Sequence, residues 1–257
     1  MKPVVVKIGG STLEEHDTIV ADLVKLQKEG VPLVVVHGGA REVSSWLARL
    51  GIATSFVDGL RVTDAETLKV VTAILGGLVN KELVLGIQAL EGKTIGISGS
   101  DGNLLRAKPM SPKMGYTGEI IATDPALLKI LLKSGYMPVV APLSRGEVKG
   151  KLTLLNINGD TAAGEIAAAL GAGKLIFLTD VEGIYDGSGK LISRLNAARA
   201  KEMLAGSAAT GGMLPKIEAS LKALGATPLV RIINGKTPHA LVKEMKNKMG
   251  GTSIVPQ

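Results

Sequence analysis

Val4-Val5-Val6-Lys7-Ile8-Gly9-Gly10, near the start of the 257-residue chain, is the stretch that decides the fold. A β-branched run followed by two glycines is typical of a strand that feeds a tight turn. The pattern returns at Val31–Val36, an apolar run followed by His37-Gly38-Gly39. Apolar runs without polar alternation indicate strands buried on both faces, as in a parallel sheet covered by helices.

Segments with helical periodicity alternate with strands along the rest of the chain. The predicted helices are Thr18–Glu29, Arg41–Leu50, Asp64–Leu90, Pro125–Lys133, Asp160–Leu170, Ala197–Leu204, Lys216–Leu224 and Pro238–Lys248. The further predicted strands are Lys93–Ser98, Pro138–Leu143, Leu175–Thr179 and Leu229–Ile233, and Leu104–Ile121 is predicted to form a hairpin flap. This order predicts an α/β protein with a mainly parallel sheet and helices on both faces.

Composition excludes several classes of protein. The formal net charge is +7, but the chain has no dense basic block and only 2% aromatic residues, so we expect no nucleic-acid partner and favour an acidic small substrate. The chain has no cysteine, which excludes disulfides and thiolate metal sites and favours the cytoplasm. No uninterrupted apolar run approaches the roughly 20 residues of a membrane span, so no membrane association is expected.

Four turns that contain glycine or aspartate follow predicted strands, and they indicate where a ligand binds. They are Gly9-Gly10, Gly38-Gly39, Ser98–Gly102 and Thr179–Gly183. In open parallel sheets, ligands bind beyond the carboxyl ends of the strands, where glycine lets backbone N–H groups approach an anion. No Walker-type or dinucleotide glycine motif is present, because Gly187-Ser188-Gly189-Lys190 lacks the upstream glycine and fits a turn better.

Two lysines are placed where they could meet an anion. Lys7 lies inside an apolar strand, so it either faces water from an edge strand or reaches a bound phosphate, and the cost of burying a charge favours phosphate. Lys216 follows glycines and Pro215 at a predicted helix start, where an anion site and a solvated lysine are equally plausible. No histidine lies in a triad-like setting, and no metal-ligand motif is present.

Asp160 and Arg61 are the other polar candidates. Asp160 is expected to cap the Ala-rich helix that follows it, and it could also pair with the two lysines. Arg61 lies between a turn and a helix cap, where it could bind a carboxylate with two hydrogen bonds or form a surface salt bridge.

Taken together, these segments resemble the amino-acid kinase family. The matching motifs are Val5–Gly10, Val36–Gly39, Gly59–Thr63, Asn156–Asp160, Leu178–Tyr185 and Gly211–Lys216, in the family's order over nearly the whole chain. Gly59-Leu60-Arg61-Val62-Thr63 points to the branch that phosphorylates the side-chain carboxylate of N-acetyl-L-glutamate in arginine biosynthesis. The resemblance implies a three-layer αβα sandwich, with an acyl-amino-acid-binding and dimerisation lobe at 1–170 and a nucleotide-binding lobe at 171–257.

The resemblance also implies roles for individual residues. Lys7 and Lys216 would stabilise the transferring phosphoryl group, and Asp160 would organise them. Gly39, Ala40, Arg61 and Asn156 would bind the acceptor. ATP would be held by Gly10, Asp180, Val181, Glu182, Gly183, Ile184, Tyr185, Ala209, Thr210 and Gly212. Mg²⁺ would bridge the phosphates through phosphate oxygens and water, with no protein ligand.

Two points of the resemblance leave alternatives open. Ala40 stands where the family usually has a third glycine, which bears on the identity of the acceptor. The alternative acceptor is aminoadipate or glutamate bound to an acidic carrier protein, although this chain lacks the S-R-x-T-type loop of that branch. The first strand starts close to the N-terminus, as in the dimeric members, and the Asp64–Leu90 helix is the expected contact of a homodimer.

Overall fold

A central eight-stranded sheet organises the molecule, of which the computed structural model describes residues 1–10, 17–205 and 213–257. Its strands are β1 (Val4–Ile8), β2 (Leu33–His37), β5 (Thr94–Ser98), β8 (Met137–Ala141), β11 (Lys174–Thr179), β12 (Arg194–Asn196), β13 (Val230–Asn234) and β14 (Thr252–Val255). They lie in the order β12-β14-β13-β11-β1-β2-β8-β5. Every neighbouring pair is parallel except β13 and β14. The predicted mainly parallel sheet is therefore confirmed, whereas β12 and β14 were not predicted.

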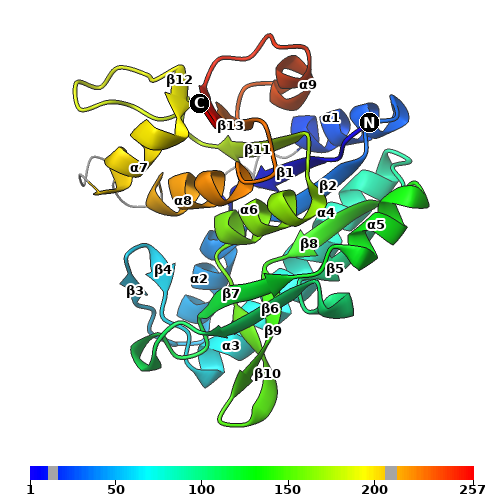
Figure 1. Ribbon diagram of the computed structural model, residues 1–257. Coiled ribbons are helices and arrows are strands. Elements are labelled where there is room, and N and C mark those ends of the chain that lie inside the picture. Colours follow the sequence, from blue (N-terminus) through cyan, green and yellow to red (C-terminus); the bar gives the residue numbers. More distant parts are fainter. Residues whose placement is uncertain (11–16, 206–212) are drawn as a thin grey trace.

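Helices cover both faces of this sheet, as the buried strands require (Figure 1). One face carries α1 (Asp17–Lys28), α4 (Asn80–Ala89) and α9 (Ala240–Met245), and the other carries α5 (Ala126–Lys133), α6 (Gly159–Leu170), α7 (Ala197–Ala205) and α8 (Met213–Ala223). In β1, Val6 and Ile8 pack with the first set and Val5 with the second. Because side chains alternate along a strand, Lys7 shares the face of Val5 and points toward α6. The three-layer αβα sandwich is confirmed.

A second, four-stranded sheet has the order β10-β9-β6-β7. Its strands are β6 (Leu105–Pro109), β7 (Gly118–Thr123), β9 (Leu143–Val148) and β10 (Lys151–Asn156). The β6–β7 hairpin confirms the predicted flap, whereas the β9–β10 hairpin was not predicted. Its two-residue turn has positive φ at Lys149 (50°) and Gly150 (75°), as the tight turns of hairpins require. A short hairpin of β3 (Phe56–Val57) and β4 (Leu60–Arg61) and helix α2 (Ala40–Arg49) complete this end of the molecule (Figure 1).

The predicted Asp64–Leu90 helix is one continuous helix with a widened centre. It runs through α3 (Ala65–Val71), a π-helical stretch (Thr72–Val79) and α4. The 25 residues Ala65–Ala89 are long and apolar enough to cross a membrane, with a hydropathy of 1.7 in their most apolar part. Here they form a core helix, because its buried residues pack against α1, α2 and strands β5, β8 and β9.

The start of α6 corrects the prediction that Asp160 is the helix cap. Asn158 is the N-cap, and its side-chain oxygen accepts hydrogen bonds from the backbone N–H groups of Asp160 (2.9 Å) and Thr161 (3.0 Å). The reason is competition, since asparagine is as good a cap as aspartate and comes first in the chain. The carboxylate of Asp160 is therefore available for other contacts.

Helices α6 and α8 approach closely at Gly164, which gives a test of the packing. A Cβ atom there would lie 2.5 Å from the Ala219 carbonyl oxygen, whereas one at Gly86 in α4 would have only ordinary contacts at 3.9 Å. We expect Gly164→Ala to lower the free energy of unfolding by about 1–3 kcal/mol, because the helices must separate. Gly86→Ala should be neutral or stabilise by up to about 1 kcal/mol through helix propensity. Urea denaturation measures both, and equal effects would contradict the assigned close packing.

Candidate active site

The glycine turns after β1 and β2 lie against each other at the carboxyl edge of the sheet. Gly38 N–H donates to the Ile8 carbonyl oxygen (2.9 Å), and Gly9 N–H donates to the Leu178 carbonyl oxygen (3.1 Å). A Cβ atom at Gly38 would lie 3.2 Å from the backbone nitrogen of Gly10. Side chains are excluded here, so backbone N–H groups can come close to an anion.

The second turn needs glycine at a further position. Gly39 has φ 143°, and a Cβ atom there would lie 2.6 Å from the Leu75 side chain in the π-helical stretch. Gly39 precedes α2 directly, so its turn leads into the amino end of a helix, which favours negative charge. Ala40 is exposed at the start of that helix, so its methyl group is accommodated.

Two lysines from distant parts of the sequence converge on Asp160. Lys7 Nζ lies 2.7 Å from Oδ1, and Lys216 Nζ donates to Oδ2 at 3.0 Å. The side chains of Lys7 and Asp160 are 9% and 7% exposed, and that of Lys216 is 17% exposed. Since β1 is central in the sheet and Lys7 is buried, the edge-strand interpretation of Lys7 is wrong. Lys216 is partly buried and paired with Asp160, which disfavours the solvated alternative.

The charges of this cluster do not cancel. Burial alone would raise the pKa of Asp160, but the ammonium groups of Lys7 and Lys216 outweigh it and hold that pKa below its ordinary value. These three side chains together carry two ammonium groups and one carboxylate, and those of Lys7 and Asp160 are mostly buried. An excess buried charge is costly unless an anion joins it, so the cluster favours binding a negatively charged group.

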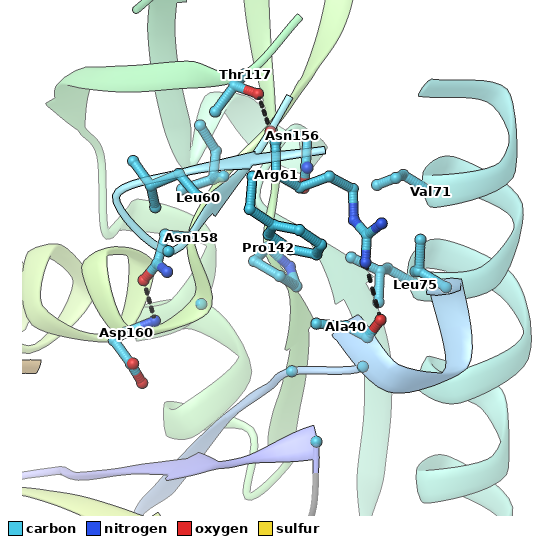
Figure 2. Close-up of a pocket in the computed structure, with 18 of the residues that line it drawn as sticks. Ala40, Leu60, Arg61, Val71, Leu75, Thr117, Pro142, Asn156, Asn158 and Asp160 are labelled. Atoms are coloured by element: carbon cyan, nitrogen blue, oxygen red, sulfur yellow. Dashed lines mark hydrogen bonds between the residues drawn. The ribbon is translucent and has the colours of Figure 1, made fainter. Parts of the chain in front are cut away.

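Arg61 occupies the far side of the same cavity (Figure 2). Its Nη2 donates to the Ala40 carbonyl oxygen (2.9 Å) and to Ser44 Oγ (2.7 Å), and its guanidinium lies over the Phe56 ring at 4.7 Å. Arg61 is 7% exposed, and burial lowers its pKa. Nη1 is buried without a hydrogen-bond partner among the described residues. The surface-salt-bridge interpretation is therefore wrong, and a donor is available for an anionic ligand.

The cavity between Arg61 and the Lys7–Asp160 pair has a volume of about 220 Å³, and Lys216 does not line it. Its apolar walls come from α2, the long helix and the segment before α6, and include Val43, Leu75 and Ile157. Asn156 reaches it from the end of β10 and donates from Nδ2 to Thr63 Oγ1 (3.0 Å). Predicted residues Lys7, Gly10, Gly39, Ala40, Arg61, Asn156 and Asp160 all line this one cavity.

The predicted nucleotide residues after β11 form a loop beside the glycine turns. The side chains of Asp180, Val181, Glu182 and Tyr185 are exposed, whereas Ile184 is 2% exposed and packs in the core. Ile184 therefore has only its backbone to offer a ligand. Arg41 Nη2, at the start of α2, lies 4.0 Å from Asp180 Oδ2 and connects this loop to the second glycine turn. Ala209, Thr210 and Gly212 lie outside the described residues.

His37 supports the second glycine turn from behind. Its Nδ1 lies 2.7 Å from the Gly38 carbonyl oxygen, and its Nε2 lies 3.2 Å from Asn80 Nδ2. Burial lowers the pKa of His37 to about 4, the Gly38 carbonyl opposes that shift, and the charge of Lys7 adds to it. The neutral ring fits both contacts, because Nδ1–H donates to Gly38 while Nε2 accepts from Asn80. His37 is therefore a structural residue of the turn.

Three residues that contact Arg61 were not predicted from the sequence. Phe56 stacks on Arg61, Ser44 accepts from it, and Thr117 Oγ1 donates to its backbone carbonyl oxygen. Phe56 is one of only two phenylalanines in the chain, and that rarity could have drawn attention to it. Nothing in the local sequence marks Ser44 or Thr117, because their partners are far away along the chain.

Comparison of the sequence with protein families matches residues 2–234 to the amino acid kinase family. An acetylglutamate kinase of Dehalococcoides mccartyi is 43% identical over 257 residues, covering 99% of this chain and 94% of that protein. An acetylglutamate kinase of Synechocystis sp. is 41% identical over 262 residues, covering 99% of this chain and 87% of that protein.

Solved structures share the fold. The N-acetylglutamate synthase of Neisseria gonorrhoeae, in complex with coenzyme A and N-acetylglutamate, superposes with a TM-score of 0.86 at 28% identity. The match covers 100% of this chain but 60% of that synthase. The carbamate kinase of Giardia lamblia bound to AMP-PNP superposes with a TM-score of 0.72 at 16% identity, over 100% of this chain and 99% of that one.

The pKa of His37 predicts a pH dependence of stability. The folded pKa of about 4 lies below the unfolded value of 6.5, so the unfolded chain binds a proton first as the pH falls. Stability from neutral His37 is complete above about pH 6.5 and is lost progressively toward pH 4, with a loss of about 2 kcal/mol between pH 7 and pH 5. Urea denaturation of the native protein and of His37→Gln across this range measures it. The same slope in both proteins would contradict the buried neutral ring.

Proposed function

The chain belongs to the amino acid kinase family and catalyses the ATP-dependent acetylglutamate kinase reaction of arginine biosynthesis, and from this premise we propose the roles of its own residues. The observation that carries the proposal is the pairing of two lysine ammonium groups, one buried and one partly buried, with one carboxylate, next to a cavity that ends at Arg61. The lysine side chains at one end, and at the other a guanidinium N–H without a partner among the described residues, suit a dianionic acceptor that receives a phosphoryl group.

Lys7 and Lys216 neutralise the charge of the migrating phosphoryl group. A side-chain carboxylate oxygen of the acceptor attacks the γ-phosphorus of ATP, the bond to the β–γ bridging oxygen breaks, and ADP leaves with that electron pair. The acceptor is already ionised at neutral pH, so no general base is needed. Catalysis of this kind rests on positioning and charge stabilisation, and Asp160 positions both ammonium groups. Gly10 and Gly39 offer backbone N–H groups to the phosphoryl oxygens.

Arg61 and Asn156 hold the acceptor. The free Nη1 of Arg61 suits the α-carboxylate, while the Asn156 side chain suits the acetamido group, and Gly39 and Ala40 form the neighbouring wall. The Ala40 carbonyl oxygen and Ser44 fix the guanidinium in the plane in which it can receive a carboxylate.

We place ATP on the loop Asp180–Tyr185, with the segment that holds Ala209, Thr210 and Gly212. Mg²⁺, when bound, neutralises charge on the phosphates. Within residues 1–10, 17–205 and 213–257, no three His, Cys, Asp or Glu side chains converge, and Asp160 is engaged by two lysines. The residues present therefore fit a metal held through phosphate oxygens and water.

The division of labour between the halves and the state of assembly are also proposals. Residues 1–170 carry the acceptor cavity and we assign them dimerisation, while residues 171–257 carry the nucleotide loop. The long helix has an exposed apolar side chain at Leu85, and a second copy of the chain is its proposed partner in a homodimer. The molecule is a soluble kinase, and its lack of cysteine suits the cytoplasm.

The identity of the acceptor is tested by ADP release over a panel of acidic acceptors. We expect turnover with N-acetyl-L-glutamate and at least about a hundredfold lower kcat/KM with free glutamate and with carrier-bound glutamate or aminoadipate, since loss of a buried polar contact costs several kcal/mol. Comparable turnover of a carrier-bound substrate would restore the alternative acceptor.

Substitution of the two lysines of α8 tests the catalytic pair. We expect Lys216→Met to lower kcat by about 10²–10³-fold, because a charge that stabilises the transition state is removed. Lys222→Met is the matched control, since Lys222 lies on the same helix with its side chain 57% exposed and paired with Glu165. Steady-state kinetics should show the control near the native rate, and similar losses in both variants would argue against a role for Lys216.

Substitution of Arg61 tests the acceptor site. We expect Arg61→Ala to raise the KM for N-acetyl-L-glutamate at least about tenfold and that for ATP less than about twofold, because the lost contact is with the acceptor carboxylate. Arg49→Ala, which removes an arginine stacked on Trp46 of α2, serves as the control. An equal rise in both KM values would reject the assignment.

A further inference from the structure

Thr252 bridges Ile184, near the end of the proposed nucleotide loop Asp180–Tyr185, and Ile192, where the chain returns toward the sheet. Between β11 and β12 the chain runs out through Tyr185, turns at Asp186–Lys190 and returns at Leu191. Thr252 Oγ1 accepts a hydrogen bond from the Ile184 backbone N–H (2.8 Å) and donates one to the Ile192 carbonyl oxygen (2.6 Å). Its hydroxyl therefore closes the base of this excursion from both sides.

The contact is buried and leaves no free space. Thr252 is 0% exposed and Ile184 is 2% exposed. A Cβ atom at Gly183 would lie 2.6 Å from Thr252 Oγ1, and one at Gly251 would lie 3.2 Å from the Glu182 carbonyl oxygen. The backbone of Glu182–Ile184 thus lies directly on Gly251–Thr252, and the hydroxyl is the acceptor of a buried N–H.

A buried ionic network fixes Gly251–Thr252 in turn. Arg231 Nη2 donates to the carbonyl oxygens of Met249 (3.1 Å) and Gly250 (2.7 Å), and Arg231 Nε pairs with Glu244. Glu244 also pairs with Lys174 at 2.9 Å. The last strand is therefore anchored to β11, β13 and α9, and it offers the loop a rigid support.

We propose that Thr252 is a positioning residue for nucleotide binding, and this rests on the proposed nucleotide site at Asp180–Tyr185. Thr252 does not face the ligand. It holds the backbone N–H of Ile184, and that backbone sets the position of the exposed Tyr185 side chain that follows. Pre-organisation of the loop reduces the entropy that ATP must remove on binding.

Thr252→Val tests the proposal, because it keeps the shape and removes the hydroxyl. We expect the KM for ATP and its Kd by calorimetry to rise about tenfold, the change expected when a buried amide loses its acceptor. The KM for N-acetyl-L-glutamate and kcat should change less than about twofold. Thr252→Ser keeps the hydroxyl and should bind ATP like the native protein. Thr252→Ala also removes the hydroxyl, but it places no methyl group against the Ile184 backbone N–H.

Thr227→Val is the matched control in the same half of the chain. Thr227 is 1% exposed, and its hydroxyl donates to the Ala167 carbonyl oxygen at 3.3 Å. This variant should leave the KM for ATP unchanged. If Thr252→Val and Thr227→Val weaken binding of both substrates alike, Thr252 has only a structural role and the proposal is overturned.

Hydrogen exchange without nucleotide provides a readout that does not depend on activity. Backbone amides of residues 183–192 should exchange faster in Thr252→Val than in the native protein, while the amides of the eight-stranded sheet exchange at the native rate. Unchanged exchange at residues 183–192 would reject the proposal. Tyr185→Ala separates the two hypotheses. If it leaves ATP binding intact, the nucleotide site is wrong; if it weakens ATP binding while Thr252→Val does not, only the role of Thr252 is wrong.

Discussion

The Asp160 carboxylate, held between two ammonium groups, is the interaction on which the rest of the site depends. Lys7 comes from the central strand, Lys216 from α8, and Asp160 from the first turn of α6 between them. Each placement has a local cause. Lys7 lies in a strand that is buried on both faces, Lys216 is brought close by the crossing of α6 and α8 at Gly164, and Asp160 follows the helix cap at Asn158. Without the carboxylate, the two ammonium groups would repel each other in a poorly hydrated pocket. Asp160 therefore stabilises the approach of β1, α6 and α8 as well as the charges of the site.

Much of the fold follows from short-range patterns. Buried apolar runs predicted β1, β2, β8 and β11 within one or two residues, because a strand covered on both faces has no polar alternation. The unpredicted strands β12 and β14 are short, and the β9–β10 hairpin mixes polar and apolar residues. The assignment of Asp160 as a helix cap failed because α6 already begins at Gly159, and Asn158 caps it by accepting from the N–H groups of Asp160 and Thr161.

The candidate site was predictable where a residue contradicts its surroundings. Lys7 stands out in an apolar strand, and the cost of burying its charge predicts a nearby anion from the sequence alone. For Arg61, the sequence left a carboxylate-binding role and a surface salt bridge open. The structure shows that Arg61 is buried and contacts Phe56, Ala40 and Ser44, so it does not lie on the surface. Ser44, Thr117 and Thr252 could not be found in this way, because an ordinary serine or threonine gains its meaning from a partner far along the chain.

The position of β1 has a consequence for synthesis of the protein on the ribosome. β1 leaves the ribosome well before one of its two neighbours, β11, because residues 9–173 lie between the two strands. Until then, one side of Val4–Ile8 has no hydrogen-bonding neighbour, while its side chains are apolar on both faces except at Lys7. Such an open strand attracts other nascent polypeptides. A lysine in mid-strand discourages such mispairing, so we expect the residue assigned to phosphoryl transfer to protect the growing chain as well.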